Sequence, residues 1–101
     1  MTITTAQDAT TYLTDLLAEA NESGATLSEL HAAHRPTGLN VLVGDVATTL
    51  DRIARHAAFP DWASPEVMTK AVRQEVRRTF RRYLLPKDLY RAAEVYALRA
   101  A

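Results

Sequence analysis

The sequence predicts an all-α protein, built as a small orthogonal or irregular bundle of about five helices. Along most of the 101 residues, apolar side chains recur at spacings of three and four, which is typical of amphipathic helices. Capping residues stand before these stretches, and Gly or Pro stands after them. Hydrophobic residues make up 48% of the chain, enough for one core at this length. We therefore expect residues 1–101 to form a single helical domain.

The first helix is expected between a threonine cap and a glycine stop. Thr4 or Thr5 can cap it, because a hydroxyl oxygen accepts a hydrogen bond from a first-turn amide. Gly24 is suited to end it, because glycine adopts the left-handed conformation that closes many helices. The apolar positions of this helix are Ala9, Tyr12, Leu13, Leu16, Leu17 and Ala20.

The middle of the chain predicts a short helix followed by a long one. Thr26 and Glu29 match a capping box that opens the short helix, and Pro36-Thr37-Gly38 ends it. Val41-Leu42-Val43 has strand character, and Gly44 weakens a helix by about 1 kcal/mol relative to Ala. A helix is still favoured, because the helical pattern persists over about five turns. Its apolar positions are Leu39, Leu42, Val43, Val46, Leu50, Ile53, Ala54 and Ala57.

The C-terminal third predicts two more helices. Ser64 is a good N-cap, and Pro65 at the first helical position loses no needed hydrogen bond. The apolar stripe of this helix is Met68, Val72, Val76, Phe80 and Tyr83. Pro86 ends this helix and begins the last one. The apolar stripe of the last helix is Leu89, Ala93, Tyr96 and Ala97.

The composition excludes several classes of protein. Without cysteine, the chain has no disulfides, thiolate metal sites or cysteine nucleophiles, which is consistent with a reducing cytoplasm. No apolar run approaches the ~20 residues that span a bilayer, and residues 1–5 lack the pattern of a signal peptide. The three glycines are scattered, so no phosphate-binding glycine loop is present. We expect a cytoplasmic protein with no membrane contact, catalytic residue, cofactor or small-molecule substrate.

The net charge of zero hides a strong asymmetry along the chain. Residues 1–34 carry five acidic side chains and no Lys or Arg, whereas residues 70–101 carry nine basic side chains and three acidic ones. The basic third is expected to face either a polyanion or an acidic protein surface. In the second case, the acidic surface can belong to a partner or to the chain's own first helix.

The basic residues gather on one side of the helix expected over residues 65–84. The candidate partner- or nucleic-acid-binding residues are Lys70, Arg73, Gln74, Arg77, Arg78, Arg81 and Arg82. Arginines at this spacing can clamp phosphates or carboxylates. Base readout needs further polar side chains beside them, and only Gln74 qualifies. Because Phe80 and Tyr83 fall on the core side, a stacking platform for single strands is not expected. A solvated or protein-docking face is favoured over direct nucleic-acid contact.

The aromatic loop and the histidines favour structural roles. Phe59 and Trp62 lie in the loop with Pro60 and are expected to fill the core; the alternative is that Trp62 is an exposed interface anchor. Tyr90 belongs with them as an interface or core aromatic. His31 and His34 are three residues apart and can present two ligands to one metal, but no third ligand is placed by the sequence. Partly exposed helix histidines are therefore favoured, and no metal site is predicted.

Four motifs follow one another in the C-terminal part of the chain. They are Phe59-Pro60-x-Trp62, an arginine-rich helix over residues 72–83, Asp88-Leu89-Tyr90 and Ala93-x-x-Tyr96. In this order they resemble the extreme C-terminus of the R subunit of type I restriction enzymes. Residues 4–57 are compatible with the helical region that precedes this tail, without a sharp motif. Asp61 departs from the small residue that the family has in the aromatic loop.

The resemblance implies a non-catalytic role for this chain. Family members combine a nuclease domain, helicase-like motor domains and a helical tail that fastens the motor to the methyltransferase core. The chain has neither the nuclease carboxylate–lysine motif nor a Walker motif, so no catalytic residue is carried over. The implied partner is the methyltransferase (modification) subunit, with duplex DNA phosphates as a further contact. The chain would then be a piece of a longer subunit or the remnant of one. The alternative is a stand-alone DNA-binding helical protein that uses the basic face of residues 65–84.

Overall fold

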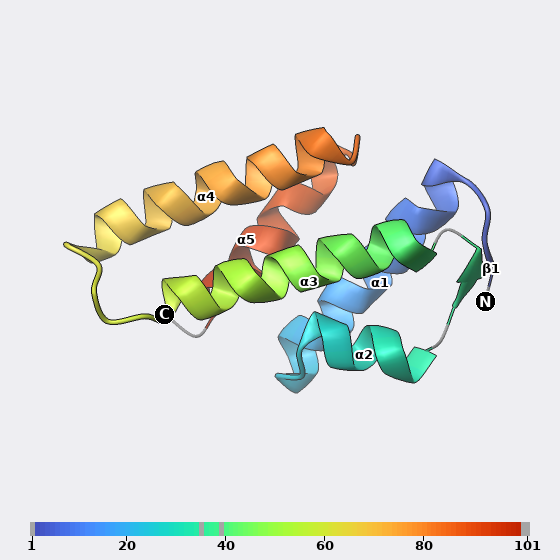
Figure 1. Cartoon of the computed structure of the whole chain (residues 1–101), viewed down its shortest axis with the longest axis horizontal. Coiled ribbons are helices and arrows are strands. Elements are labelled where there is room, and N and C mark those ends of the chain that lie inside the picture. Colours follow the sequence, from blue (N-terminus) through green and yellow to red (C-terminus); the bar gives the residue numbers. More distant parts are fainter. Residues whose placement is uncertain (1, 35, 39, 100–101) are drawn as a thin grey trace.

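The computed structural model describes residues 2–34, 36–38 and 40–99, and helices dominate these ranges (Figure 1). The α-helices are α1 (Ala6–Ser23), α2 (Leu27–His34), α3 (Asn40–Ala57), α4 (Pro65–Arg82) and α5 (Tyr90–Leu98). A single 3-10 turn, η1 (Lys87–Leu89), leads into α5. The prediction of an all-α bundle of about five helices is confirmed.

Helix α1 has both of the ends that its sequence predicts. Thr5 is the N-cap: its hydroxyl oxygen accepts from the Asp8 amide at 3.1 Å, and the Asp8 carboxylate accepts from the Thr5 amide at 3.3 Å. The Thr4 hydroxyl also donates to this carboxylate, and these hydrogen bonds lower the pKa of Asp8. At the other end, Gly24 has φ 80°, in the left-handed region that glycine adopts without steric cost.

The long middle segment is helical, as its periodicity predicts. In a strand, Val41 and Val43 would point to the same side. Instead Val43 is fully buried and Val41 is 72% exposed, because successive residues of a helix are turned by about 100°. Val43 shares the buried side with Val46 and Leu50. Leu39, which we placed in the same apolar series, lies outside the described residues.

The described residues include a very short pair of strands that the sequence did not predict. β1 (Thr2–Ile3) pairs in parallel with β2 (Thr37–Gly38), and this pairing ties the start of the chain to the segment before α3. Ile3 becomes fully buried. Gly38 has φ 83°, and a Cβ there would lie 2.0 Å from the Ile3 carbonyl oxygen, so the pairing requires glycine. A strand of two residues carries no periodicity that a sequence pattern can reveal.

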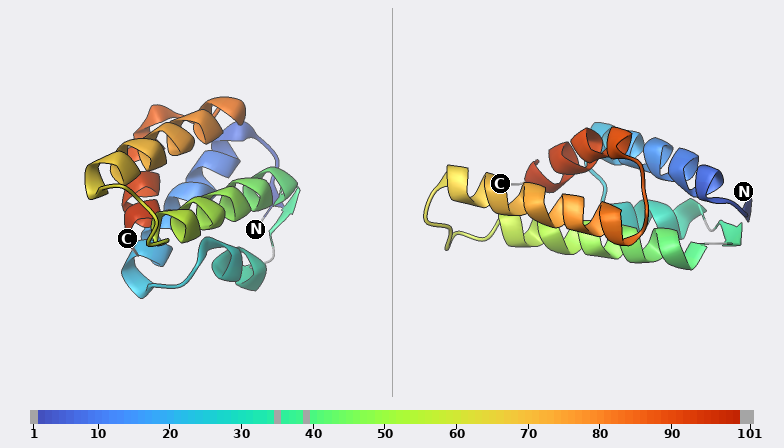
Figure 2. Two further views of the ribbon diagram at one scale, coloured as in Figure 1. Left: turned by 60° about the vertical axis from the view of Figure 1, so that its left-hand side comes forward. Right: turned by 90° about the horizontal axis from the view of Figure 1, so that it is seen from above.

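The helices are arranged around α3 and α5. Helix α4 runs back along α3 after the loop of residues 58–64, and α5 crosses the pair on one side (Figures 1 and 2). Helices α1 and α2 cover the remaining side of α3 and α5. The stripe predicted for α5 is buried: Leu89, Ala93, Tyr96 and Ala97. Within the described ranges, none of the helices combines the length and the apolarity needed to cross a membrane.

Candidate functional site

Helix α4 lies at the edge of the bundle and turns one side to solvent (Figure 1). The Ser64 hydroxyl oxygen caps it by accepting from the Val67 amide at 3.2 Å, and Pro65 occupies its first turn. Four of its predicted stripe residues are buried against α3 and α5: Met68, Val72, Val76 and Phe80. Tyr83, the fifth, follows the helix and is half-buried. Burial of this stripe fixes which residues face outward.

The seven predicted residues form a continuous exposed surface, which we call the basic face. It consists of Lys70, Arg73, Gln74, Arg77, Arg78, Arg81 and Arg82, and every one of them is exposed. The N-terminal half of this face lines a shallow depression together with Pro65, Glu66 and Thr69. Six cationic side chains are therefore accessible from one direction along one helix.

A carboxylate from α5 holds two of these arginines in place. Glu94 is 12% exposed, and its two oxygens lie 3.7 Å from Arg73 Nε and 3.8 Å from Arg77 Nε. Both arginine side chains remain about half exposed, at 51% and 54%. The two ion pairs join α4 to α5.

Apart from the two pairs with Glu94, the basic face forms one further ion pair among the described residues, and that pair is exposed to solvent. Arg78 Nη1 lies 2.9 Å from Glu75 Oε1 one helical turn away, an exposed pair of the kind that contributes little to stability. Arg81 Nε donates to the Arg77 carbonyl at 3.4 Å. Among the described residues, Lys70, Arg81 and Arg82 form no ion pair. These three cations are available to an anionic partner.

The alternative in which the acidic first helix masks the basic face is wrong. Helix α1 packs on α2 and α5, with lesser contact to α3, and in the described part of the chain no ion pair joins it to α4. Two of its four acids have other partners: Asp8 caps α1 itself, and Glu19 pairs with His34 at 3.0 Å. The physical reason is geometric, since α5 and α3, not α1, bury the apolar stripe of α4.

The aromatic loop divides its two large side chains between core and solvent. Trp62 is half-buried against the core, its Nε1–H donates to the His56 carbonyl at 2.9 Å, and its ring lies 5.1 Å from the His56 ring. Phe59 is 57% exposed, so the expectation that it fills the core is wrong. Its amide donates to the same carbonyl in a tight turn at the end of α3, which directs Phe59 away from the core. Tyr90 packs edge-on against Phe80, with ring centroids 5.4 Å apart, as a core aromatic.

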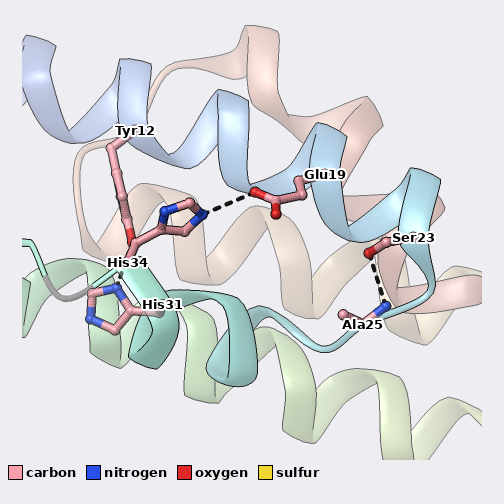
Figure 3. A network of polar contacts seen from close by, with 6 residues as sticks. All are labelled: Tyr12, Glu19, Ser23, Ala25, His31 and His34. Carbon is pink, nitrogen blue, oxygen red and sulfur yellow. Dashed lines mark hydrogen bonds and ion pairs between the residues drawn. The ribbon is translucent and has the colours of Figure 1, made fainter.

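The two helix histidines join α2 to α1 (Figure 3). Tyr12 Oη lies 3.0 Å from His31 Nδ1, and His34 Nε2 lies 3.0 Å from Glu19 Oε2. Both rings meet the Tyr12 ring edge-on, at 5.8 and 6.2 Å. Burial, followed by the charge of Glu19, raises the pKa of Tyr12. In the described ranges, no group of three or more His, Asp or Glu side chains is placed to hold a metal ion.

Sequence reasoning missed a buried polar network centred on Asp51 of α3. Its carboxylate is 9% exposed and accepts from the Ser28 amide at 3.1 Å, from the Ser28 hydroxyl and from the Tyr96 hydroxyl. The Tyr96 oxygen in turn accepts from the Leu27 amide at 2.9 Å. Burial and the bond to Asp51 raise the pKa of Tyr96 to about 12. A signal existed, since Asp51 follows Ala47 by four residues on the apolar side of its helix.

This network caps α2 from other parts of the chain. The first amides of α2 have no partner within their own helix, and three different residues satisfy them. Tyr96 of α5 accepts from Leu27, Asp51 of α3 accepts from Ser28, and the Thr26 hydroxyl accepts from Glu29 at 3.1 Å. The last bond is the half of the predicted capping box that the structure contains. The network is therefore an internal support for the fold.

Arg99 performs the equivalent task at the C-terminal end of α1. Its guanidinium donates to the carbonyls of Ala20, Gly24 and Ala25, and lies 4.4 Å from the centroid of the Tyr96 ring. Among the described residues, no buried side-chain nitrogen or oxygen is left without a hydrogen-bond partner. The polar groups buried in the described part of the chain thus bond to one another, whereas the six cations of the basic face lie exposed at the surface.

Comparison of the chain with protein families, with curated protein sequences and with solved structures gives no significant match.

Proposed function

We propose that this chain is a non-catalytic helical assembly module. In this proposal it resembles the C-terminal domain of a type I restriction R subunit and docks the ATP-dependent motor and nuclease onto the methyltransferase core. Such a complex works in the cytoplasm. The proposal rests on the exposed basic face of α4. Glu94 of α5 pairs with two of its arginines. The same helix is part of the segment that resembles the R-subunit tail.

The chemistry of this face favours an acidic protein surface as the partner. Arginine forks match carboxylates as well as phosphates, so charge alone does not decide between protein and DNA. Sequence-specific contact with DNA also requires side chains that read base edges, and Gln74 is the only uncharged polar side chain of the face. Phe80 lies on the inner side of α4, where it is fully buried and cannot stack on bases.

The proposal is tested by reversing two charges of the basic face. Lys70 and Arg81 are exposed and have no ion pair within the described residues, so K70E/R81E should change the free energy of unfolding by less than about 1 kcal/mol. Arg73 and Arg77 are left intact, because glutamates there would face Glu94, which is only 12% exposed.

The measurement is the dissociation constant for the purified cognate modification–specificity complex, by fluorescence anisotropy. We expect K70E/R81E to weaken binding at least tenfold. The matched control, R52E/R55E, reverses two exposed charges on α3, outside α4 and the segment that follows it, and gives the same net charge. Equal binding by both double variants would refute docking through the basic face, and a wild-type chain that does not bind the complex would refute the proposed function.

Direct binding to duplex DNA is the second candidate, and the three cations without an ion pair favour it. It predicts an affinity for a random 30-base-pair duplex that falls steeply between about 50 and 200 mM salt, since phosphate contacts release counterions. K70E/R81E should reduce this affinity and flatten the salt dependence. An affinity that does not respond to salt would exclude this candidate.

A further inference from the structure

The chain leaves α4 through a leucine in an unusual backbone conformation. Leu84 has φ 56°, and it is the only non-glycine residue with positive φ in the described ranges. The Leu85 amide donates to the Phe80 carbonyl at 2.8 Å, and the Leu84 amide donates to the Arg81 carbonyl at 3.3 Å. These bonds close the helix in the manner of a Schellman motif, in which the left-handed position usually holds glycine.

The same chain uses glycine at the corresponding point of α1. Gly24 ends α1 at φ 80°, and no atom lies within 4 Å of the place where its Cβ would be. Leu84, in contrast, bears the steric strain of a side chain in the left-handed region and places that side chain in water, at 88% exposure. It is the most exposed of the large apolar side chains in the described part of the protein. Neither local conformation nor core packing explains a leucine here.

Leu84 stands at the C-terminal end of the basic face. Arg81 and Arg82 precede it and Lys87 follows it, and all three are exposed without an ion pair among the described residues. An apolar side chain with cationic neighbours in the chain fits a recess that is apolar at its centre and acidic at its rim, since protein–protein interfaces combine an apolar core with a polar rim.

We propose that Leu84 is the apolar anchor of the basic face and inserts into an apolar recess, bordered by carboxylates, on a partner protein. The inference rests on the proposed function and names the chemistry of the partner's surface. Backbone strain held at an exposed position is a feature of ligand-binding segments, and here it holds the leucine outward beyond the end of α4. Duplex phosphates offer no apolar recess for this side chain.

The test substitutes Leu84 and measures thermal stability and partner affinity. For L84G, stability should be kept or raised while affinity falls. L84G relieves the left-handed strain, so its melting temperature should equal or exceed that of the wild type. Its affinity for the purified modification–specificity complex should fall at least tenfold, equivalent to 1.4 kcal/mol, because the anchor is lost. L84M keeps a long apolar side chain and should stay within about threefold of the wild type. V41A removes exposed apolar surface from α3 and should leave binding unchanged.

The outcomes distinguish a failure of the Leu84 anchor from a failure of the proposed function. If the wild type binds the complex and L84G binds within twofold of it, the anchor is refuted and docking by the basic face stands. If the wild type does not bind the complex, the proposed function is refuted and the anchor with it. If L84G loses tenfold in affinity for a random 30-base-pair duplex, Leu84 acts as a wedge between base steps, and the protein recess is refuted.

Discussion

The Tyr96 hydroxyl is the group whose removal should reveal most about how this bundle is held together. It donates to the Asp51 carboxylate of α3 and accepts from the Leu27 amide at the start of α2, at 2.9 Å. Three helices therefore meet at one oxygen atom. The substitution Tyr96→Phe removes that atom and keeps the ring, so that its effect reports on the hydrogen bonds alone.

The expected loss follows from burial. Tyr96 is 1% exposed, so water cannot replace the missing hydroxyl without rearranging the core. A hydrogen bond to a charged group contributes about 1.5–3 kcal/mol, and a buried amide left without a partner costs about 1–3 kcal/mol. Because the Asp51 carboxylate keeps its two bonds from Ser28, we expect a net loss of about 2–4 kcal/mol. That is a large share of the roughly 5–15 kcal/mol by which domains are stable.

The assay is urea unfolding followed by circular dichroism, with the free energy extrapolated to water. Tyr90→Phe is the matched control, because Tyr90 is half-buried and its hydroxyl has no hydrogen bond in the described part of the structure. The control should change stability by no more than about 0.5 kcal/mol. A loss below about 1 kcal/mol for Tyr96→Phe, or equal losses for both variants, would refute the reasoning that this hydroxyl supports the fold.

Two more predictions concern the same region. The folded-state pKa of Tyr96, about 12, lies above the ordinary value of 10.0, so its contribution to stability is complete below pH 10 and declines between about pH 10 and 12. Urea unfolding at about pH 9 and pH 11 should show this decline in the wild type and a smaller one in Tyr96→Phe, whereas parallel declines would contradict the assignment. Arg99→Gln should lower stability by about 1–2 kcal/mol, because the α1 carbonyls and the Tyr96 ring lose a shared cation. A thermal melt measures this loss, and an unchanged midpoint would show that water replaces the guanidinium.

The sequence alone identified the helices because their signals are local. Ser64 and Pro65 start α4, and the spacing of its apolar stripe decides which side is buried. The same spacing places the basic face on the opposite side, so that its exposure could be predicted without tertiary information. Thr5 and Gly24 define α1 in the same way, since caps act within four residues of their own helix.

Phe59 shows where reasoning from residue type failed. A large aromatic beside a proline favours core filling, yet Phe59 is exposed because the turn after α3 directs it outward. Trp62, three residues later, packs against the core instead, and its Nε1–H donates to the His56 carbonyl. Which of two neighbouring aromatics is buried depends on the path of the loop, and hydrophobicity does not encode that path.

Sequence by itself thus determined the fold class, both ends of α1, the start of α4 and the existence of a one-sided cationic surface. Only the tertiary structure decided how that surface is oriented and supported. Glu94 reaches Arg73 and Arg77 from another helix, and Asp51 meets Tyr96 from 45 residues away in the chain. The physical reason is range: periodicity and caps act within one helix, whereas these pairings depend on how separate helices cross. Crossing geometry follows from the packing of the whole core, which no local pattern records.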